Sequence, residues 1–225
     1  MRHFYPISKN LLACLFFLVA MFAGDFAMAQ VRVPFTQRTS QYTPTRKIYN
    51  IKGDFAMIGN TNMTLVNYGN NTSNDNPMQY VDIDGDPNTL NSSSATLVLS
   101  NENGALPNCS DIVYAGLYWT GRAHDSNSSD TFTVTKNGVT KNYNKRVVSI
   151  KGPGASGYTN FTAGTNDIWY PNNADGNMYS AYVEVTDYVR NQGLGAYTVA
   201  DIALREGSGG STGYYGGWSL VVVYE

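Results

Sequence analysis

The sequence predicts an all-β protein, an antiparallel β-sandwich of the jelly-roll-like type. Short runs of Val, Ile, Thr, Tyr and Phe recur from Lys47 to Tyr224. Clusters of Asn, Gly, Ser and Asp separate these runs, and the turn signals are regularly spaced. This pattern is typical of antiparallel sandwiches and barrels, because parallel folds instead alternate strands with long helical segments.

Each expected strand is a run of residues that fit a pleated, half-buried surface. In chain order the expected strands are Lys47–Ile51, Phe55–Ile58, Met63–Tyr68, Gln79–Ile83, Ala95–Leu99, Ile112–Trp119, Thr131–Thr135, Val139–Tyr143, Val147–Ile150, Tyr179–Val185, Tyr197–Leu204 and Trp218–Tyr224. Residues 47–225 are therefore assigned to a single sandwich domain.

Local signals refine three of these elements. Asn137-Gly138 favours positive φ at both positions and predicts a type I′ turn between Lys136 and Val139. Ile112–Trp119 and Trp218–Tyr224 carry few charges, so we expect central strands covered on both faces or nearly so.

One segment has helical signals. Thr186 or Asp187 can cap a short turn through Tyr188, Val189 and Arg190, which Gly193 ends.

The first 29 residues have the three parts of a secretory signal peptide. Arg2 and Lys9 give a basic start, Leu11–Phe22 is an apolar run, and Ala27-Met28-Ala29 is a small-residue cleavage site. The run is too short to span a bilayer as a helix, although a retained N-terminal anchor is the alternative. We therefore expect a secreted or cell-surface protein, exported by the general secretory route, that begins at Gln30 and has no membrane contact after cleavage.

Cys14 follows Leu11-Leu12-Ala13 and superficially resembles the acylated cysteine of a lipoprotein. The apolar run continues past Cys14 instead of preceding it, so a lipoprotein is the less favoured interpretation. Residues 30–46 are polar and are expected to form an extended leader. Glu225 comes directly after an apolar run. We therefore expect that this sequence is the N-terminal part of a longer protein and that the sandwich lacks its last strands here.

Composition restricts the chemistry. Signal cleavage leaves Cys109 and His124 as the one cysteine and the one histidine, so neither an internal disulfide nor a Cys/His zinc site can form. The formal net charge is −2 and charged residues make up 14% of the chain, below the average of about 25%. Because no basic stripe occurs, we expect neither nucleic acid nor an anionic membrane as a partner.

Several segments carry a resemblance to a known group. They are Gly53–Thr61, Val113–Trp119, Val185–Val189, Tyr197–Val199 and Gly216–Glu225. Through them the chain resembles the N-terminal domain of large repetitive surface proteins of the Bacteroidota, similar to bacterial proteins with DUF11-type repeats. The resemblance implies an adhesin-like role, often with type IX secretion through a gliding-motility-type sorting domain, which does not occur within these 225 residues. It supplies no catalytic residues.

The segment Asp82–Asn88 carries oxygen-bearing side chains at alternate positions, which are Asp82, Asp84, Asp86 and Asn88. A loop can curl such residues around Ca²⁺, so these four are candidate metal ligands and calcium is the one possible cofactor. The segment is not an EF-hand because the glycine and the closing glutamate are misplaced. The alternative is a solvated turn, in which Asp, Gly and Asn simply favour tight backbone geometry.

Four aromatic residues in polar surroundings are candidate ligand contacts: Trp169, Tyr170, Tyr214 and Tyr215. Aromatic faces stack on the C–H faces of sugars, while neighbouring amides bond hydroxyls. Packing in the core or at sheet edges is the alternative for any Tyr or Trp in a β protein. Trp119 and Trp218 are expected to be core residues.

No motif supports an enzyme. His124 and Asp125 lie beside Ser126, Ser128, Ser129 and Asp130, but residues this close in one loop do not easily hold a triad, and no Gly-x-Ser-x-Gly elbow occurs. Glu184 and Asp187 form a carboxylate pair of a kind that arises by chance. The sequence therefore predicts a non-catalytic surface domain acting in adhesion or surface assembly, with a surface glycan or a neighbouring surface protein as partner. A cap or stalk of a surface filament and a secreted glycan hydrolase are the alternatives.

Overall fold

The structure is a computed structural model that describes residues 36–69, 75–123, 130–170 and 178–225. The compact unit that contains the strands extends from Thr39 to Glu225. The expected signal peptide, Cys14 and the loop from His124 to Ser129 lie outside the described residues.

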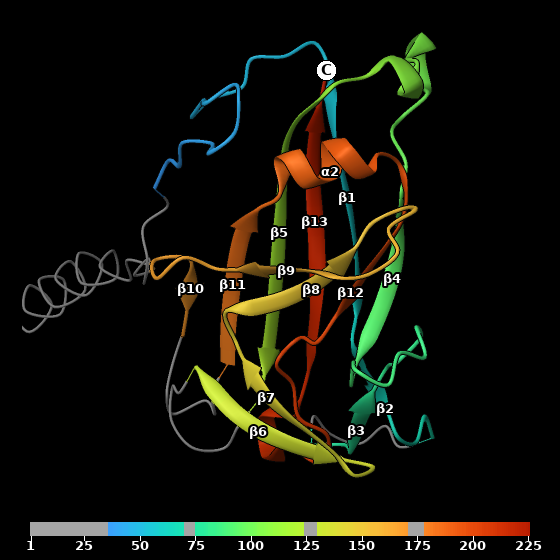
Figure 1. The fold of residues 1–225 in the computed structure, drawn as a ribbon, viewed down its shortest axis with the longest axis vertical. Helices are drawn as coiled ribbons and strands as arrows, with labels where there is room; N and C mark the ends of the chain where they lie inside the picture. Colours follow the sequence, from blue (N-terminus) through green and yellow to red (C-terminus); the bar gives the residue numbers. More distant parts are fainter. Residues whose placement is uncertain (1–35, 70–74, 124–129, 171–177) are drawn as a thin grey trace, which may run out of the picture. The chain divides into compact units, whose positions relative to one another are not determined.

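The fold is an antiparallel all-β sandwich, as the sequence predicts (Figure 1). A five-stranded sheet has the order β1-β13-β5-β11-β10, with bounds Asp54–Thr61, Gly216–Tyr224, Ile112–Arg122, Met178–Glu184 and Ile168–Trp169. A four-stranded sheet has the order β4-β12-β8-β9, with bounds Ser92–Leu97, Gly195–Ala200, Val147–Lys151 and Thr159–Thr162. Two small hairpins, β2–β3 (Met63–Leu65, Met78–Tyr80) and β6–β7 (Thr131–Lys136, Val139–Asn144), complete the strands of the described residues.

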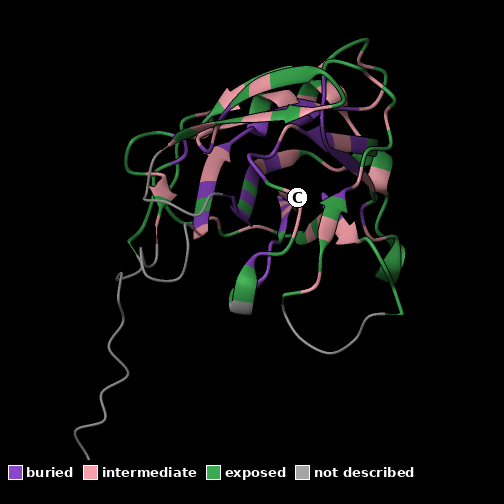
Figure 2. Cartoon of the chain, turned by 90° about the horizontal axis from the view of Figure 1, so that it is seen from below, coloured by how far each residue is buried: buried purple, intermediate pink, exposed green. Residues whose placement is uncertain are grey.

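The core lies between the two main sheets, where Figure 2 shows the buried residues gathered. Trp119 on β5 and Trp218 on β13 are paired across the strands and are 1% and 5% exposed, which confirms the expected core position of both. Each indole N–H has a partner, Lys145 O for Trp119 and Ser93 Oγ for Trp218, both at 2.9 Å. The two rings therefore occupy the core without leaving a buried donor unpaired.

A polar network ties the sheets together inside this core. The amide of Asn62 donates to Asn91 Oδ1 at 2.9 Å and accepts from Ser93 Oγ at 2.6 Å. Asn91 Nδ2 in turn donates to Ile202 O at 2.9 Å and to Tyr143 Oη at 3.1 Å. Because buried polar groups are costly unless paired, these bonds fix the packing of the segments that they join.

The predicted hairpin is confirmed. Lys136 pairs with Val139, and Asn137 and Gly138 have φ values of 51° and 82°, the positive values that a two-residue type I′ loop requires. The central position of β5 and β13 is also confirmed. Their expected coverage on both faces is wrong, since Tyr118 is 38% exposed on the face that points away from the core.

The predicted helical segment forms α2, Thr186–Gln192, and ends at Gly193 with a φ of 74°. Its cap differs from the expectation, because Val185 is the N-cap residue and gives no side-chain hydrogen bond. Thr186 Oγ1 instead accepts from Ala115 N at 3.0 Å and donates to Glu184 Oε1 at 2.9 Å. Short 3₁₀ turns cover Glu102–Gly104, Pro107–Cys109 and Gly210–Thr212. No helix in the described ranges is both long and apolar enough to cross a bilayer.

Several strand predictions are wrong. Lys47–Ile51 forms no strand, because this segment passes over the sheet and Tyr49 packs its ring on Tyr114 instead of joining a ladder. The sequence analysis does not predict β9 and β10. β9 is short and mostly polar, and β10 has only two residues, Ile168 and Trp169. β12 ends at Ala200 instead of Leu204, because Asp201 adopts a φ of 57° that interrupts the strand.

β1 is the edge strand of the five-stranded sheet. Two of its backbone N–H groups, at Phe55 and Thr61, donate to the side-chain oxygens of Asp54 and Asn60, each at 2.8 Å. The edge is thus blocked locally at both ends of the strand.

Candidate functional site

A row of residues, small except for Trp169 at one end, crosses the outward face of the five-stranded sheet. The strand registers align, in order, Trp169 on β10, Ser180 on β11, Thr120 on β5, Gly217 on β13 and Thr61 on β1. Adjacent strands lie about 4.8 Å apart, so the row is roughly 19 Å long. We call this row the trough.

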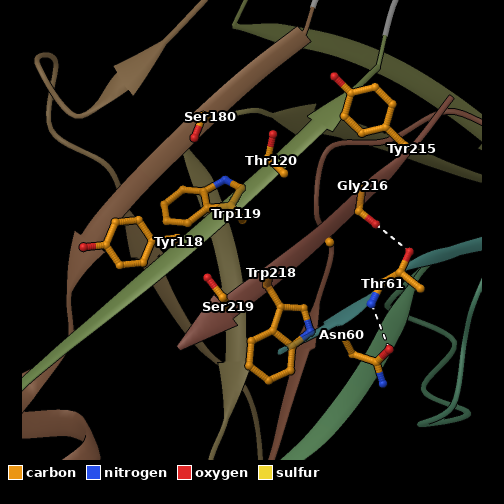
Figure 3. A pocket seen from close by; sticks show the side chains of 11 residues that line it. Asn60, Thr61, Tyr118, Trp119, Thr120, Ser180, Tyr215, Gly216, Trp218 and Ser219 are labelled. Carbon is orange, nitrogen blue, oxygen red and sulfur yellow. Dashed lines mark hydrogen bonds between the residues drawn. The ribbon is translucent and has the colours of Figure 1, made fainter. Parts of the chain in front are cut away.

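Aromatic rings flank the middle of the trough. A cavity of about 470 Å³ lies over it, lined by Thr61, Thr120, Ser180 and Gly217 and by the rings of Tyr118 and Tyr215. Figure 3 shows the two tyrosines at opposite ends of this cavity, with Thr120 and Ser180 between them. The surface is therefore an open groove with small side chains at its floor and exposed rings at its walls.

The Tyr118 ring is held in place by its neighbours. Gly116 lies between Tyr114 and Tyr118 on the outward face, and a Cβ at Gly116 would lie 2.4 Å from Tyr114 Oη and 3.1 Å from Tyr118 Cε2. Tyr114 Oη donates to Tyr182 Oη at 3.0 Å, and the Tyr118 and Tyr182 ring centroids are 4.9 Å apart. Burial, together with hydrogen bonds to Tyr118 and Tyr182, raises the pKa of Tyr114, so the Tyr114 hydroxyl keeps its proton at neutral pH.

A second set of contacts positions Tyr215. The buried Arg122 side chain donates to Gly209 O and to Gly213 O, the latter at 3.0 Å, and lies 5.2 Å from the centroid of the Tyr214 ring. Arg122 N also donates to Tyr215 O at 3.0 Å. The loop that carries Tyr215 is thereby tied to the end of β5, next to the trough.

The structure brings two of the four predicted aromatic contacts to the trough. Trp169 is 46% exposed and lies opposite Ser180, and Tyr215 is 37% exposed on the cavity wall. Tyr214 is buried beneath Arg122 instead. Tyr170 is half-buried and donates to the Asp130 carboxylate, and it is not among the residues that line the trough cavity.

Sequence reasoning missed Tyr118, Thr120, Ser180, Gly217 and Ser219. The signal was present as a period of two, because outward positions of a strand alternate with core positions. In β5 the outward positions read Tyr, Gly, Tyr, Thr, and in the first half of β13 they read Gly, Ser. Small and polar outward positions on central strands indicate an open face.

The other end of the same outward face is covered by the leader. Gln41 N and the hydroxyl of Ser40 donate to the Glu184 carboxylate, the former at 2.8 Å. The Tyr49 and Tyr114 ring centroids lie 6.1 Å apart. We call residues 39–49 the strap. The strap and the trough thus divide the outward face between a covered half and an open half.

The aspartates of the predicted calcium segment act as hydrogen-bond acceptors in a turn. Asp84 accepts from Tyr158 Oη, from Thr89 Oγ1 at 3.0 Å and from Asp86 N at 3.0 Å. Burial raises the pKa of Asp84, but these hydrogen bonds outweigh it and the net shift is downward. Burial and the neighbouring Asp84 raise the pKa of Asp82.

Asp86 Oδ1 accepts from Asn88 N at 2.9 Å and from Asn88 Nδ2 at 2.8 Å. Within the described residues, no three His, Cys, Asp or Glu side chains gather in a way that could hold a metal ion. These bonds form a turn, and calcium binding at this segment stays a prediction.

Lys145 is a buried cation of a different kind. It is 0% exposed, and its Nζ has no hydrogen-bond partner in the described part of the chain. The ammonium lies 5.4 Å from the Tyr170 ring centroid and 5.7 Å from that of Tyr179. Burial lowers the pKa of Lys145, and the nearby Asp130 carboxylate partly opposes this shift.

The carboxylates of Glu184 and Asp187 do not face one substrate site. Glu184 is buried under the strap, while Asp187 accepts from Arg190 Nη1 at 2.9 Å on the surface of α2. Of the described residues that line the trough cavity, none is acidic, basic or a histidine. The tyrosine rings of the trough can stack on a ligand, and its Ser and Thr side chains can form hydrogen bonds with ligand hydroxyls. These are interactions that bind a ligand.

Comparison of the chain with known protein families, with characterised proteins and with solved structures gives no match.

Proposed function

We propose that this chain is an exported cell-surface domain that acts in adhesion or surface assembly as a non-catalytic binding module. The observation that carries the proposal is the trough, an open groove with exposed rings on a rigid central sheet. Binding residues on such a scaffold keep their geometry without a ligand. The signal-peptide pattern and the resemblance to Bacteroidota surface proteins support the export and the surface location.

The composition of the trough favours binding over catalysis. A glycan hydrolase needs two carboxyl groups that flank the scissile bond. The described residues lining the groove supply hydroxyls, rings and one amide, but no carboxylate. The partner is a surface glycan or a neighbouring surface protein, and weak single contacts gain strength when many copies are displayed together.

A structural cap or stalk of a surface filament is the second candidate. Phe55 and Met57 on the edge strand β1 are 63% and 66% exposed, and both point outward from the sheet. Adjacent exposed apolar side chains favour contact with another protein. In this case β1, and not the trough, would carry the interaction.

Binding of the labelled mature protein to cells of the producing bacterium tests the proposal. We expect saturable binding that decreases about tenfold in the double variant Tyr118→Ala/Tyr215→Ala, because both walls of the trough are lost. Phe55→Ala is the matched control, an exposed ring on the same face outside the trough. Loss of binding in Phe55→Ala alone would favour the cap or stalk, and turnover of a polysaccharide by the purified protein would contradict a binding module.

A further inference from the structure

The trough has a lining that selects one class of ligand. Its floor consists of Ser180, Thr120, Gly217 and Thr61, which are all small, and its walls are tyrosine rings. No charged side chain lines the cavity among the described residues. An anionic or cationic ligand would lose its hydration here without gaining an opposite charge, which is unfavourable. The lining therefore favours a neutral ligand.

The hydroxyl groups at the floor of the trough indicate which class of neutral ligand fits it. In the described part of the chain, no hydrogen bond involves the hydroxyl of Ser180 or of Ser219. Thr120 Oγ1 donates to Tyr179 O at 2.6 Å, so its oxygen keeps acceptor capacity toward the groove. A purely apolar ligand would leave these hydroxyls without partners, while a ligand rich in hydroxyls would pair with them.

The elongated form of the trough suits an extended, chain-like ligand. Trp169, at one end of the row, lies opposite Ser180, and Tyr118 and Tyr215 face the middle. The exposed rings are thus spread along an open groove that is roughly 19 Å long by strand spacing. An open groove of this length accommodates several linked rings in an extended chain, whereas a single small molecule would contact only part of it.

We propose that the trough binds an uncharged oligosaccharide that lies across the strands, with sugar rings stacked on Tyr118, Tyr215 and Trp169. The inference rests on the proposed binding function and names its ligand class. Ser180, Ser219 and Thr120 bond sugar hydroxyls. A neutral polysaccharide of a cell surface or an extracellular matrix has this chemistry, and uronic-acid or sialylated chains do not.

The test compares neutral and acidic tetrasaccharides as probes, with binding followed by NMR or calorimetry on the mature protein. Cellotetraose and mannotetraose represent the neutral class, and tetragalacturonate represents the acidic class. We expect at least one neutral probe to bind with an affinity on the order of tenfold or more above that of the acidic probe. Equal or tighter binding of tetragalacturonate, or no binding of either neutral probe, overturns the inference.

A steric variant locates the site without removing a ring. Ser180→Phe fills the floor at an exposed position, so we expect binding of the neutral probe to be lost while the melting curve is unchanged. Thr96→Phe is the matched control, the same bulk at an exposed position of the four-stranded sheet. Unchanged sugar binding in Ser180→Phe overturns the inference.

Cell binding separates this inference from the proposed function. If cell binding is sensitive to Ser180→Phe but no neutral saccharide binds, the trough is a binding site for a protein and the ligand class is wrong. If cell binding is absent as well, both proposals fail.

Discussion

Glu184, at the end of β11, and Lys145, directly after β7, are charged side chains that are 4% and 0% exposed. Their surroundings are opposite. The Glu184 carboxylate accepts from Ser40 Oγ, Gln41 N and Thr186 Oγ1. The Lys145 ammonium, in the described part of the chain, faces aromatic rings and has no acceptor.

The difference shows two ways of burying a charge. A carboxylate that accepts several hydrogen bonds recovers much of the hydration that it loses, and it organises the donors around it. An ammonium over aromatic rings recovers only part of that loss, so its charge remains a cost in the folded state. We therefore expect Glu184 to stabilise the fold and Lys145 to lower its stability at neutral pH.

Glu184→Ala is expected to have the largest effect. It removes the acceptor of Gln41 N and of Thr186 Oγ1 and one of the two acceptors of Ser40 Oγ, and it frees the strap from the sheet. The free energy of unfolding should therefore fall by about 3 kcal/mol. Urea denaturation followed by fluorescence measures this loss. Asp187→Ala is the control, because it removes an exposed carboxylate in the first turn of α2. It should lower the free energy of unfolding by less than about 1 kcal/mol. Equal losses in both variants would contradict the special role of Glu184.

Asp84 separates the effect of hydrogen bonding from that of burial. Like Glu184, its carboxylate accepts several hydrogen bonds, but its side chain is only half-buried. Asp84→Ala should lower the free energy of unfolding by about 1.5 kcal/mol, since Tyr158, Thr89 and Asp86 N lose their acceptor. Glu102→Ala, at an exposed carboxylate, should have almost no effect.

The same variant tests calcium at Asp82, Asp84, Asp86 and Asn88. Because the acceptors are engaged within the turn, we expect chelation with EDTA to leave the melting temperature unchanged. A melting temperature that falls on chelation in the native chain, and not in Asp84→Ala, would instead establish the calcium site.

Lys145→Met is expected to have the smallest effect and the opposite sign. The substitution removes a buried charge and keeps the apolar stem, so the free energy of unfolding at pH 7 should rise by about 1 kcal/mol. Lys151→Met is the matched control, since Lys151 Nζ also lies over a tyrosine ring, 5.0 Å from the Tyr158 centroid, but is not fully buried. A clear loss of stability in Lys145→Met would show that the ammonium has a favourable partner.

The difference in stability between Lys145→Met and the native chain should depend on pH, because the pKa of Lys145 is lowered in the folded state. Its ordinary value is 10.5, so between the folded-state pKa and 10.5 the unfolded chain binds more protons and stability rises with pH. The advantage of Lys145→Met should therefore be greatest below the folded-state pKa and shrink as the pH rises towards 10.5. An advantage that grows with pH would contradict this account.

The sequence allows the fold class, the hairpin and the short helix to be predicted, because each depends on local chemistry. Asn137-Gly138 needs no distant partner to form its turn, and Gly193 ends α2 wherever the helix lies. The strap could not be predicted, since the contacts of Ser40 with Glu184 join residues 144 positions apart. A polar leader and a strap have the same composition.

The trough was predictable only in part. Trp169 and Tyr215 stand out in sequence because polar residues surround them. Tyr118 was hidden in an apolar strand, and its exposure depends on which face of β5 the second sheet covers. Tyr214 and Tyr215 are adjacent and chemically identical, yet the Tyr214 ring is buried against the Arg122 guanidinium while the Tyr215 ring is exposed at the trough. Such choices are made by tertiary packing.

The local hydrogen bonds at the two ends of β1 affect how a second molecule could approach this edge of the sheet. Asp54 and Asn60 occupy the N–H groups of Phe55 and Thr61, so a strand from a neighbouring molecule cannot extend the sheet along the whole of β1. If two copies met at this edge, they would touch through the exposed side chains of Phe55 and Met57 and would not share a continuous sheet. A contact through side chains alone lacks the ladder of backbone hydrogen bonds that makes fibres persistent, so it would come apart again on dilution.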